Sequence, residues 1–379
     1  MIPLARYGER IAKAARTAAS EGVDALLIGV GADLEYLAGY AAMPLERLTM
    51  LVLLAGGPAW LVVPRLEVEP ARACPGVVGG YAEVVTWDEI DDPYVLAGSL
   101  AALPASGARV GVSHTLWALH LLGLQRALPR AAFELATRVT RQLRMRKDAD
   151  EIALLRQAAE AADRVVGQVA RGRLVGRTEA DVAREVRERL LAEGHEQAQF
   201  AIVGSGPNSA SPHHGASERV IQAGEPIVLD IGGTLGGYHS DMTRTMWVTG
   251  GDAALGPDEA FRHLFGILQS AQAAASAAVR PGLACEAVDA IARDRIAAEG
   301  YGPNFFHRTG HGIGLEVHEE PYLVAGNAEP LDIGYAFSVE PGIYLEGRYG
   351  ARIEDIVVCG SDGPIILNVA SRDLWVVDG

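Results

Sequence analysis

Hydrophobic residues in the first third of the chain follow two alternating patterns. Short apolar runs of strand length, VDALLIGV (23–30) and TMLVLLAGG (49–57), alternate with stretches of helical periodicity such as residues 6–20. Short continuous apolar runs favour buried strands, and their alternation with helices is typical of α/β domains. The pattern therefore predicts a small α/β domain at the N-terminal end.

A segment dense in basic residues, RVTRQLRMRKDAD (138–150), ends this pattern and has little apolar periodicity. At roughly 150 residues per domain, a chain of 379 residues accommodates two domains. We therefore expect an N-terminal domain over residues 1–140 and a second domain over residues 141–379.

The second domain is predicted to begin with a pair of helices. Asp148 and Glu151 form a capping-box pattern, and the apolar residues after them, from Ile152 to Val169, recur at spacings of three and four. Thr178 and Asp181 mark the start of the next helix, which ends at Gly194. A comparable pair follows over residues 258–279 and 284–300.

Each helix pair is followed by a glycine-rich segment with histidines and then by an apolar strand carrying a carboxylate. The strand segments are VLDIGG in the first half and FSVEPGIY in the second. Asp230 and Glu340 are 110 residues apart, and Asp241 and Glu354 are 113 apart. Helix–helix–strand order also recurs by chance in α+β proteins, but the matched carboxylates favour two structurally related halves that face each other.

Composition excludes several classes of protein. Apolar residues make up 49% of the chain, and the net charge of −15 repels nucleic acid and anionic lipid. The longest apolar stretch, residues 49–63, contains two glycines and a proline and is shorter than the roughly 20 residues of a membrane helix. The N-terminus has charges where a signal peptide is apolar, so we expect a cytoplasmic protein whose three scattered cysteines are reduced core thiols.

Candidate chemistry is concentrated in the second domain, where four carboxylates stand at matched positions. Asp230 follows an apolar strand, where an unpaired charge is costly to bury, and one hairpin brings Asp241 beside it. Glu340 and Glu354 repeat this arrangement fourteen residues apart. Each acid alone is explained as well by a turn cap, but four converging carboxylates repel one another unless divalent cations cancel their charge.

The imidazole of His311, in HRTGHGIGLEVHE, completes such a metal-ligand set. Oxygen-rich sites with one nitrogen favour manganese, cobalt or iron over structural zinc, although zinc stays open. Two adjacent metal ions that share a hydroxide and polarise a carbonyl are typical of hydrolases. The pattern predicts a dinuclear hydrolase.

Five segments carry a resemblance to a known family: VLDIGG, SDMTRT, RTGHGIGLEVHE, VEPGIY and ARIED. In this order and spacing they resemble the metal-binding core of the proline-specific metallopeptidases, which include Xaa-Pro dipeptidase (prolidase) and aminopeptidase P. Residues 23–40 resemble the creatinase-like N-terminal domain of that family, and residues 143–163 resemble its domain junction. The resemblance implies an α/β creatinase-like domain, an α+β pita-bread catalytic domain with an internal pseudo-twofold repeat, and a homodimer.

The resemblance also implies roles for individual residues. The implied metal ligands are Asp230, Asp241, His311, Glu340 and Glu354. The implied catalytic residues are His213 and His318, which stabilise charge on the scissile carbonyl oxygen, and Glu340, which transfers a proton from the attacking water to the leaving nitrogen. His213 is preferred to His214 from the alignment of PHHG, and His307, Arg352 and Thr243 are implied as pocket residues, the first two as substrate-binding.

One position departs from the family pattern. Archaeal-type prolidases have an arginine shortly after the HE pair that holds the terminal carboxylate of the dipeptide, but HEEPY has Tyr322 there. Arg352 or Arg47 are candidates to replace it. The departure leaves strict dipeptidase specificity open.

Five functions are compared. We expect an Xaa-Pro dipeptidase (prolidase) that uses two divalent ions, with manganese as the first choice of metal and a small peptide with proline at its second position, foremost the dipeptide, as substrate. The alternative within the family is an aminopeptidase P that accepts longer peptides; a methionine aminopeptidase usually lacks the N-terminal domain. A non-catalytic pita-bread interaction module and a metal-free amidinohydrolase like creatinase are disfavoured because all five ligands are present.

Overall fold

The computed structural model describes residues 1–101, 103–104 and 107–379. The chain divides into two compact units, Met1–Arg144 and Met145–Gly379. The division lies four residues after the boundary expected from the sequence, because the basic segment there is not a linker: helix α7 (Thr137–Arg144) buries Val139 and Leu143. The helical periodicity of this segment was hidden by its many charged residues.

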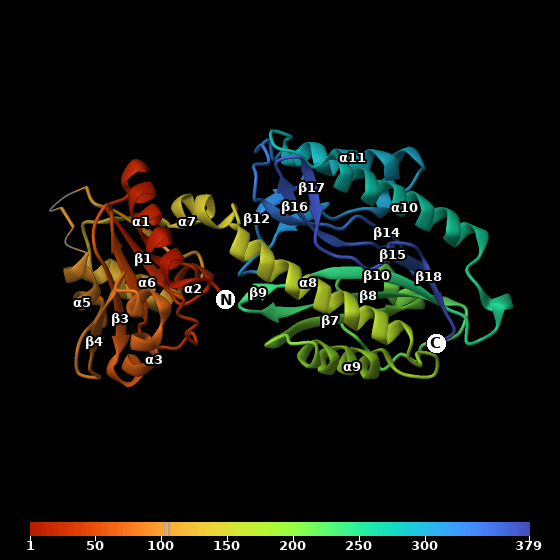
Figure 1. The fold of residues 1–379 in the computed structure, drawn as a ribbon, viewed down its shortest axis with the longest axis horizontal. Coiled ribbons are helices and arrows are strands. Elements are labelled where there is room, and N and C mark those ends of the chain that lie inside the picture. The colour runs from red at the N-terminus through yellow and green to blue at the C-terminus, as the bar shows by residue number, and fades with distance from the viewer. Residues whose placement is uncertain (102, 105–106) are drawn as a thin grey trace. The chain divides into compact units, whose positions relative to one another are not determined.

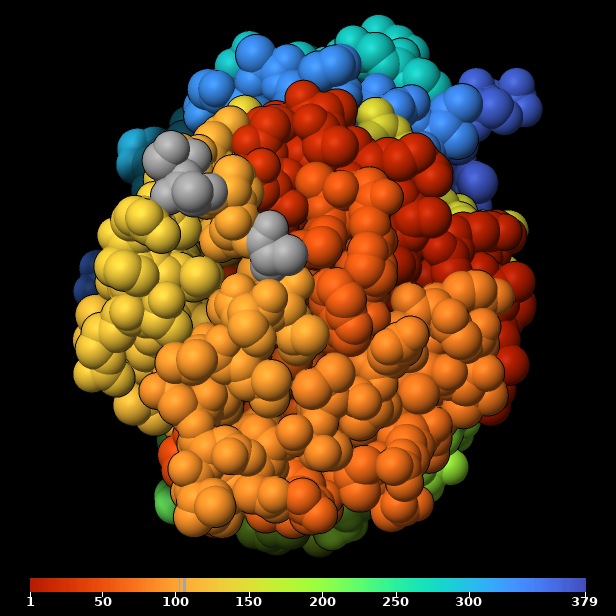
Figure 2. All heavy atoms as spheres, turned by 90° about the vertical axis from the view of Figure 1, so that its left-hand side faces the viewer, coloured from red at the N-terminus to blue at the C-terminus, as the bar shows by residue number. Residues whose placement is uncertain are grey.

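The N-terminal unit is built on a six-stranded mixed sheet with the strand order β4-β3-β2-β1-β5-β6 (Figure 1). Apolar side chains of β1 and β2 are almost all buried, as expected from their continuous apolar runs. The strands are β1 (Ala25–Gly29), β2 (Met50–Leu54), β3 (Ala59–Pro64), β4 (Glu83–Trp87), β5 (Arg109–Val112) and β6 (Ala132–Leu135). In Figure 2 this unit faces the viewer, and its orange segments make up most of the visible surface.

The helices of this unit connect the strands, and together with the sheet they form the predicted α/β domain. They are α1 (Leu4–Ser20), α2 (Ala32–Ala38), η1 (Arg65–Glu67), α3 (Val68–Ala73), α4 (Pro75–Val78), α5 (Pro93–Leu100) and α6 (Ala118–Ala127). Helix α1 packs against α2, α4 and α7.

The second unit consists of two helix pairs and two main sheets. The predicted helices are present as α8 (Ala149–Ala170), α9 (Glu179–Ala192), α10 (Glu259–Ala278) and α11 (Cys285–Ala298). Asp148 caps α8 in a complete capping box with Glu151, and Thr178 caps α9 by accepting from the Asp181 amide. The local sequence signals therefore predicted these helix starts correctly.

The first main sheet has the order β18-β10-β8-β7 with β9 paired to β8, and the second has the order β12-β11-β13-β16-β17. A separate hairpin joins β14 to β15. The strands of the first sheet are β7 (Gln197–Ser205), β8 (Glu225–Leu235), β9 (Tyr238–His239), β10 (Met242–Val248) and β18 (Trp375–Val377). The others are β11 (Gly310–Gly312), β12 (Glu319–Leu323), β13 (Ala336–Val339), β14 (Gly342–Leu345), β15 (Tyr349–Arg352), β16 (Asp355–Gly360) and β17 (Gly363–Ile366), and short 3₁₀ turns lie at η2 (Gly206–Ala210), η3 (Ala253–Leu255) and η4 (Gly302–Asn304).

Each half of this unit has a hydrophobic core of its own. Helices α8 and α9 pack on β7, β8 and β10 around one cluster of buried residues, and α10 and α11 pack on the second sheet around another (Figure 1). This arrangement is the pseudo-twofold repeat expected from the sequence.

Two simpler expectations concern composition. Cys74, Cys285 and Cys359 are free and buried, as expected for core thiols. Among the described residues, none of the helices is both long enough and apolar enough to cross a membrane.

Candidate metal centre

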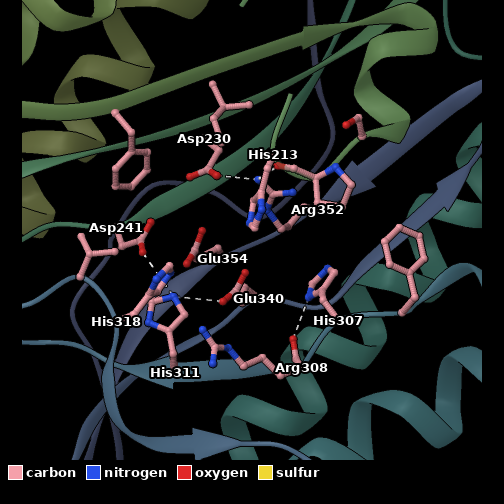
Figure 3. Close-up of a pocket in the computed structure, with 16 residues that line it drawn as sticks. His213, Asp230, Asp241, His307, Arg308, His311, His318, Glu340, Arg352 and Glu354 are labelled. Atoms are coloured by element: carbon pink, nitrogen blue, oxygen red, sulfur yellow. Dashed lines mark hydrogen bonds and ion pairs between the residues drawn. The ribbon is translucent and has the colours of Figure 1, made fainter. Parts of the chain in front are cut away.

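All five predicted metal ligands line one cavity of about 410 Å³ in the second unit (Figure 3). They come from both halves, although up to 124 residues of sequence separate them. They are Asp230, Asp241, His311, Glu340 and Glu354. The cavity is therefore the place where the two sheets present their acidic side chains to each other.

The first half supplies two aspartates from one antiparallel strand pair. Strand β8 pairs with β10 so that Asp230 lies opposite Thr243, and Asp241 immediately precedes β10. The hairpin predicted from the sequence is confirmed, with the short strand β9 inserted in its turn. Asp230 is not at a strand end as expected but lies in the middle of β8, because the strand continues through the glycines of IGGTL to Leu235.

The second half supplies two glutamates and one histidine. Strands β13 and β16 pair so that Val339 lies opposite Asp355; Glu340 directly follows β13, and Glu354 directly precedes β16. His311 is the central residue of β11, which pairs with both β12 and β13. Pairing of these three neighbouring strands thus brings the three side chains close together.

The distances within the cluster are those of potential ligands to a shared cation. Ligand atoms of Asp241, His311 and Glu354 all lie within 4.8 Å of one another. His311 Nε2 is 3.2 Å from Glu340 Oε1 and 3.5 Å from Asp241 Oδ2. These side chains point toward one centre in Figure 3.

Asp230 has an unsatisfied oxygen. Its Oδ2 accepts a hydrogen bond from Arg352 at 2.6 Å, but its buried Oδ1 has no hydrogen-bond partner among the described residues. An unpartnered buried carboxylate oxygen is costly unless a cation meets it. A divalent cation therefore fits this donor set of carboxylates and one imidazole.

The electrostatics of the cluster lead to the same conclusion. Burial, together with repulsion from neighbouring carboxylates, raises the pKa of Asp241 and of Glu354 well above the ordinary values. Burial also raises the pKa of Glu340, but the hydrogen bond and charge of His311 outweigh it and hold that pKa at about 2. Positive charge at the centre would remove the repulsion that the remaining acids experience.

Arg352 lines the cavity together with the acids, and hydrogen bonds occupy most of its guanidinium. Besides Asp230, its guanidinium donates to Thr243 Oγ1 at 3.0 Å and to Tyr344 Oη at 2.9 Å, and Thr243 donates in turn to Glu354 at 2.7 Å. Arg352 is only 2% exposed. The geometry gives Arg352 a role in orienting Asp230, and its expected role in binding substrate stays a prediction.

Besides His311, three predicted histidines line the cavity: His213, His307 and His318. His214 does not line it and donates through Nε2 to Glu179 at 2.7 Å, so its ring points away from the ligands. The ring of His318 lies edge-on to His311 with centroids 4.2 Å apart. Burial and the nearby His311 lower the pKa of His318 to about 4, so its ring is neutral at pH 7.

Arg308 was not identified from the sequence as a site residue, yet it lines the cavity between His307 and His311 (Figure 3). Its guanidinium carbon lies 4.4 Å from the centroid of the Tyr322 ring, the residue that departs from the family pattern. Arg47, the other candidate replacement, lies in the N-terminal unit and pairs with Glu46 and Glu89. The signal available in the sequence was a cation between two pocket histidines in HRTGH.

Comparison with known proteins identifies both parts of the chain. Residues 153–361 match metallopeptidase family M24, and residues 10–146 match the creatinase/prolidase N-terminal domain. The probable dipeptidase PepE of Mycobacterium tuberculosis is 48% identical over 372 residues, which cover 98% of this chain and 96% of that protein.

Solved structures agree with these sequence matches. The crystal structure of dipeptidase PepE from Mycobacterium ulcerans has a TM-score of 0.93 and 46% identity, and covers 99% of both chains. The prolidase from Thermococcus sibiricus has a TM-score of 0.89 and 34% identity, and covers 98% of this chain and 99% of that one. The expected fold, a creatinase-type α/β domain and a pita-bread catalytic domain, is confirmed.

Proposed function

The chain belongs to metallopeptidase family M24, and from that premise we propose that it is a dinuclear-metal dipeptidase that cleaves the bond before proline. The observation that carries the proposal is the convergence of five ligand-type side chains on one cavity, with a buried Asp230 oxygen that has no partner among the described residues. Relatives named dipeptidase and prolidase, matched over nearly the whole chain, support the substrate class.

The residues proposed to hold two divalent ions are the four carboxylates and the one imidazole of the cluster. When bound, such ions lower the pKa of a water molecule and polarise the carbonyl of the scissile bond. Manganese is the expected metal because the donor set is mostly carboxylate oxygen. The homodimer and the cytoplasmic location also stay predictions.

The proton transfers are assigned to the protein's own side chains. Glu340 lies among the ligands beside His311 and is ionised at neutral pH, so it is assigned to take a proton from the attacking water. It then delivers that proton to the leaving nitrogen. His318 is neutral at pH 7 and, together with His213, donates an N–H hydrogen bond to the developing negative charge on the carbonyl oxygen.

A bond before proline makes a special demand on the site. The nitrogen of that bond carries no hydrogen, so the site has no amide donor to recognise and must accept the ring instead. Apolar side chains of Phe200, Ile202, Phe306 and Val317 line the cavity beside the histidines. They provide walls for the ring without polar groups that would be left unpaired.

We assign the preference for dipeptides over longer peptides to Arg308. Its guanidinium lies in the cavity and is supported by the Tyr322 ring, so it can pair with the free carboxylate of a dipeptide. A longer peptide places an uncharged amide at this position. Arg308 therefore favours dipeptides in place of the arginine that archaeal-type prolidases have at the position of Tyr322.

The test uses protein stripped with a chelator and then assayed with and without added manganese. We expect release of free proline from Ala-Pro with metal only, with slower cleavage of Ala-Leu and of the tripeptide Ala-Pro-Ala. Equal cleavage of Ala-Pro and Ala-Leu would refute the proline preference and leave a general dipeptidase. Faster cleavage of the tripeptide would favour the aminopeptidase alternative.

A further inference from the structure

Two buried carboxylates outside the metal centre occupy related positions in the two halves. Glu179 begins α9, and Asp289 lies in the first half of α11, 110 residues later. Asp230 and Glu340 have the same separation. Glu179 is 0% exposed and Asp289 is 1% exposed, and neither is among the described residues that line the cavity.

Glu179 is surrounded by hydrogen-bond donors from one segment. Its Oε1 accepts from the Ser205 amide at 2.8 Å and from Ser205 Oγ at 2.7 Å. Its Oε2 accepts from His214 Nε2 at 2.7 Å and from Ser217 Oγ at 2.6 Å, and Asn208 Nδ2 bridges both oxygens at 3.1 Å. These contacts outnumber the roughly four lone-pair sites of a carboxylate, so both oxygens are fully used as acceptors and some donors share a site.

These donors flank a short piece of chain that enters the cavity. Ser205 and Asn208 precede it, and His214 and Ser217 follow it, while residues 211–213 line the cavity between them. His213 is the last of these three residues. A single buried side chain thus holds both ends of the turn that presents His213.

The charge on Glu179 suits this role. Burial by itself raises its pKa, but the hydrogen bonds from Ser217, Ser205 and His214 outweigh burial and lower the pKa to about 2. Glu179 is therefore an acceptor only at neutral pH. An isosteric amide would turn one of its two acceptors into a donor that faces other donors.

Asp289 makes the corresponding contacts in the second half. Its Oδ1 accepts from the Thr309 amide at 3.0 Å and from Thr309 Oγ1 at 2.7 Å, the same pair of donors that Ser205 offers Glu179. Both oxygens also accept from Arg293, whose guanidinium donates to the carbonyl oxygens of Phe305 at 2.8 Å and His307 at 2.7 Å. The segment held in this way contains His307 and Arg308.

We propose that Glu179 and Asp289 are positioning residues that hold the two histidine-bearing walls of the active site, the first acting through His213 and the second through His307. The inference rests on the proposed peptidase function. It assigns to the helices a task beyond packing, since each helix pair carries one carboxylate that fixes the nearby wall. Their effect on catalysis is indirect, because neither carboxylate reaches the cavity.

The kinetic test is a pair of double-mutant cycles with Ala-Pro as substrate. Glu179→Gln is expected to lower kcat/KM by roughly 10- to 100-fold, since small misplacements of catalytic groups have effects of this size. In a His213→Ala background the same substitution should lower kcat/KM by less than about twofold, because the side chain that Glu179 positions is already absent. Asp289→Asn should behave in the same way with His307→Ala.

Asp163→Asn is the matched control. Asp163 is also a buried carboxylate on a helix, and it accepts from the Val369 amide at 2.6 Å and from Asn368 Nδ2 at 3.2 Å, which lie outside the cavity lining. The Asp163→Asn substitution should lower the free energy of unfolding without lowering kcat/KM by more than about twofold. The inference for His213 would be overturned if Glu179→Gln lowered kcat/KM equally in both backgrounds, or if it did not lower kcat/KM in the wild-type background.

A structural readout separates failure of this inference from failure of the proposed function. Hydrogen exchange of peptides spanning 205–217 should accelerate in Glu179→Gln and stay at the wild-type rate in Asp163→Asn, whether or not the wild type cleaves Ala-Pro. Unchanged protection in Glu179→Gln would refute the positioning role. If Glu179→Gln fails to fold, Ser217→Ala removes one donor and should show a smaller, local acceleration; its absence would also refute the role.

Discussion

Asp230 and Glu340 occupy matched positions in the two halves of the catalytic unit, yet their surroundings differ. The guanidinium of Arg352 lies 2.6 Å from Asp230, whereas the imidazole of His311 lies 3.2 Å from Glu340. Burial raises the pKa of Asp230, and the charge of Arg352 only partly opposes it. Glu340 has the lower pKa, about 2, because His311 donates to it.

The different partners of Asp230 and Glu340 show how a repeated fold can have an asymmetric site. Strand pairing in each half delivers a carboxylate to the same cavity, so the positions follow from the repeat. The neighbour of each carboxylate is not repeated. We therefore assign a mainly electrostatic and ligand role to the first half, and both ligand and proton-transfer roles to the second.

The largest effect on turnover should come from removing either member of the His311–Glu340 pair in the second half. His311→Ala or Glu340→Ala is expected to lower metal content and reduce turnover of Ala-Pro by at least about 10³-fold while the chain stays folded. Metal analysis and circular dichroism on the same samples check this. A variant that keeps most of its activity would show that the ligand assignment is wrong.

Removing the partner of Asp230, the carboxylate of the first half, should lower stability. Arg352→Met leaves Asp230 buried without its partner, and breaking a buried ion pair costs roughly 3–5 kcal/mol of unfolding free energy. Chemical denaturation of metal-free protein measures this loss. The comparison would break down if His311→Ala destabilised the metal-free fold as much as Arg352→Met does.

His318 tests whether a cavity histidine acts on the reaction or on the ions. His318→Ala is expected to keep the metal content of the wild type and to lower kcat by about 10²- to 10³-fold, the size seen when one donor to an oxyanion is removed. Loss of metal equal to that in His311→Ala would instead make His318 a ligand.

Arg308 is expected to affect binding more than rate. Arg308→Met keeps the length of the side chain but removes its charge, so KM for Ala-Pro should rise by roughly tenfold with a small change in kcat. KM for Ala-Pro-amide, which has no free carboxylate, is the control and should change little. A similar rise for both peptides would remove Arg308 from the specificity assignment.

The smallest expected effect is on acid stability. The pKa of Glu179 is lowered from about 4.5 in the unfolded chain to about 2 in the fold, so the unfolded state binds the extra proton between these values. Its contribution to stability is present above pH 4.5 and is lost as pH falls toward 2. Denaturation from pH 5 to 2.5 should show a slope for the wild type steeper than that for Glu179→Gln by up to about 1.4 kcal/mol per pH unit.

Local sequence signals predicted the helices of the catalytic unit well. The start of α8 at Asp148 and that of α9 at Thr178 follow from caps that involve residues two to three positions apart. The division between the units, after Arg144, falls within the basic segment 138–150 that suggested the boundary, four residues beyond residue 140. The prediction that Asp230 ends its strand was wrong, because β8 continues through Gly232 and Gly233 to Leu235.

The sequence by itself determined the family, the fold and the set of side chains for the proposed metal centre, because motif order, caps and apolar periodicity depend on residues close together in the chain. The tertiary structure decided which of His213 and His214 lines the cavity, that Arg352 is buried against Asp230, and that Arg308 lies over Tyr322. The contact between Arg352 and Asp230 joins residues 122 positions apart. No local pattern encodes such partners, because only the packing of two folded halves brings them within hydrogen-bonding distance.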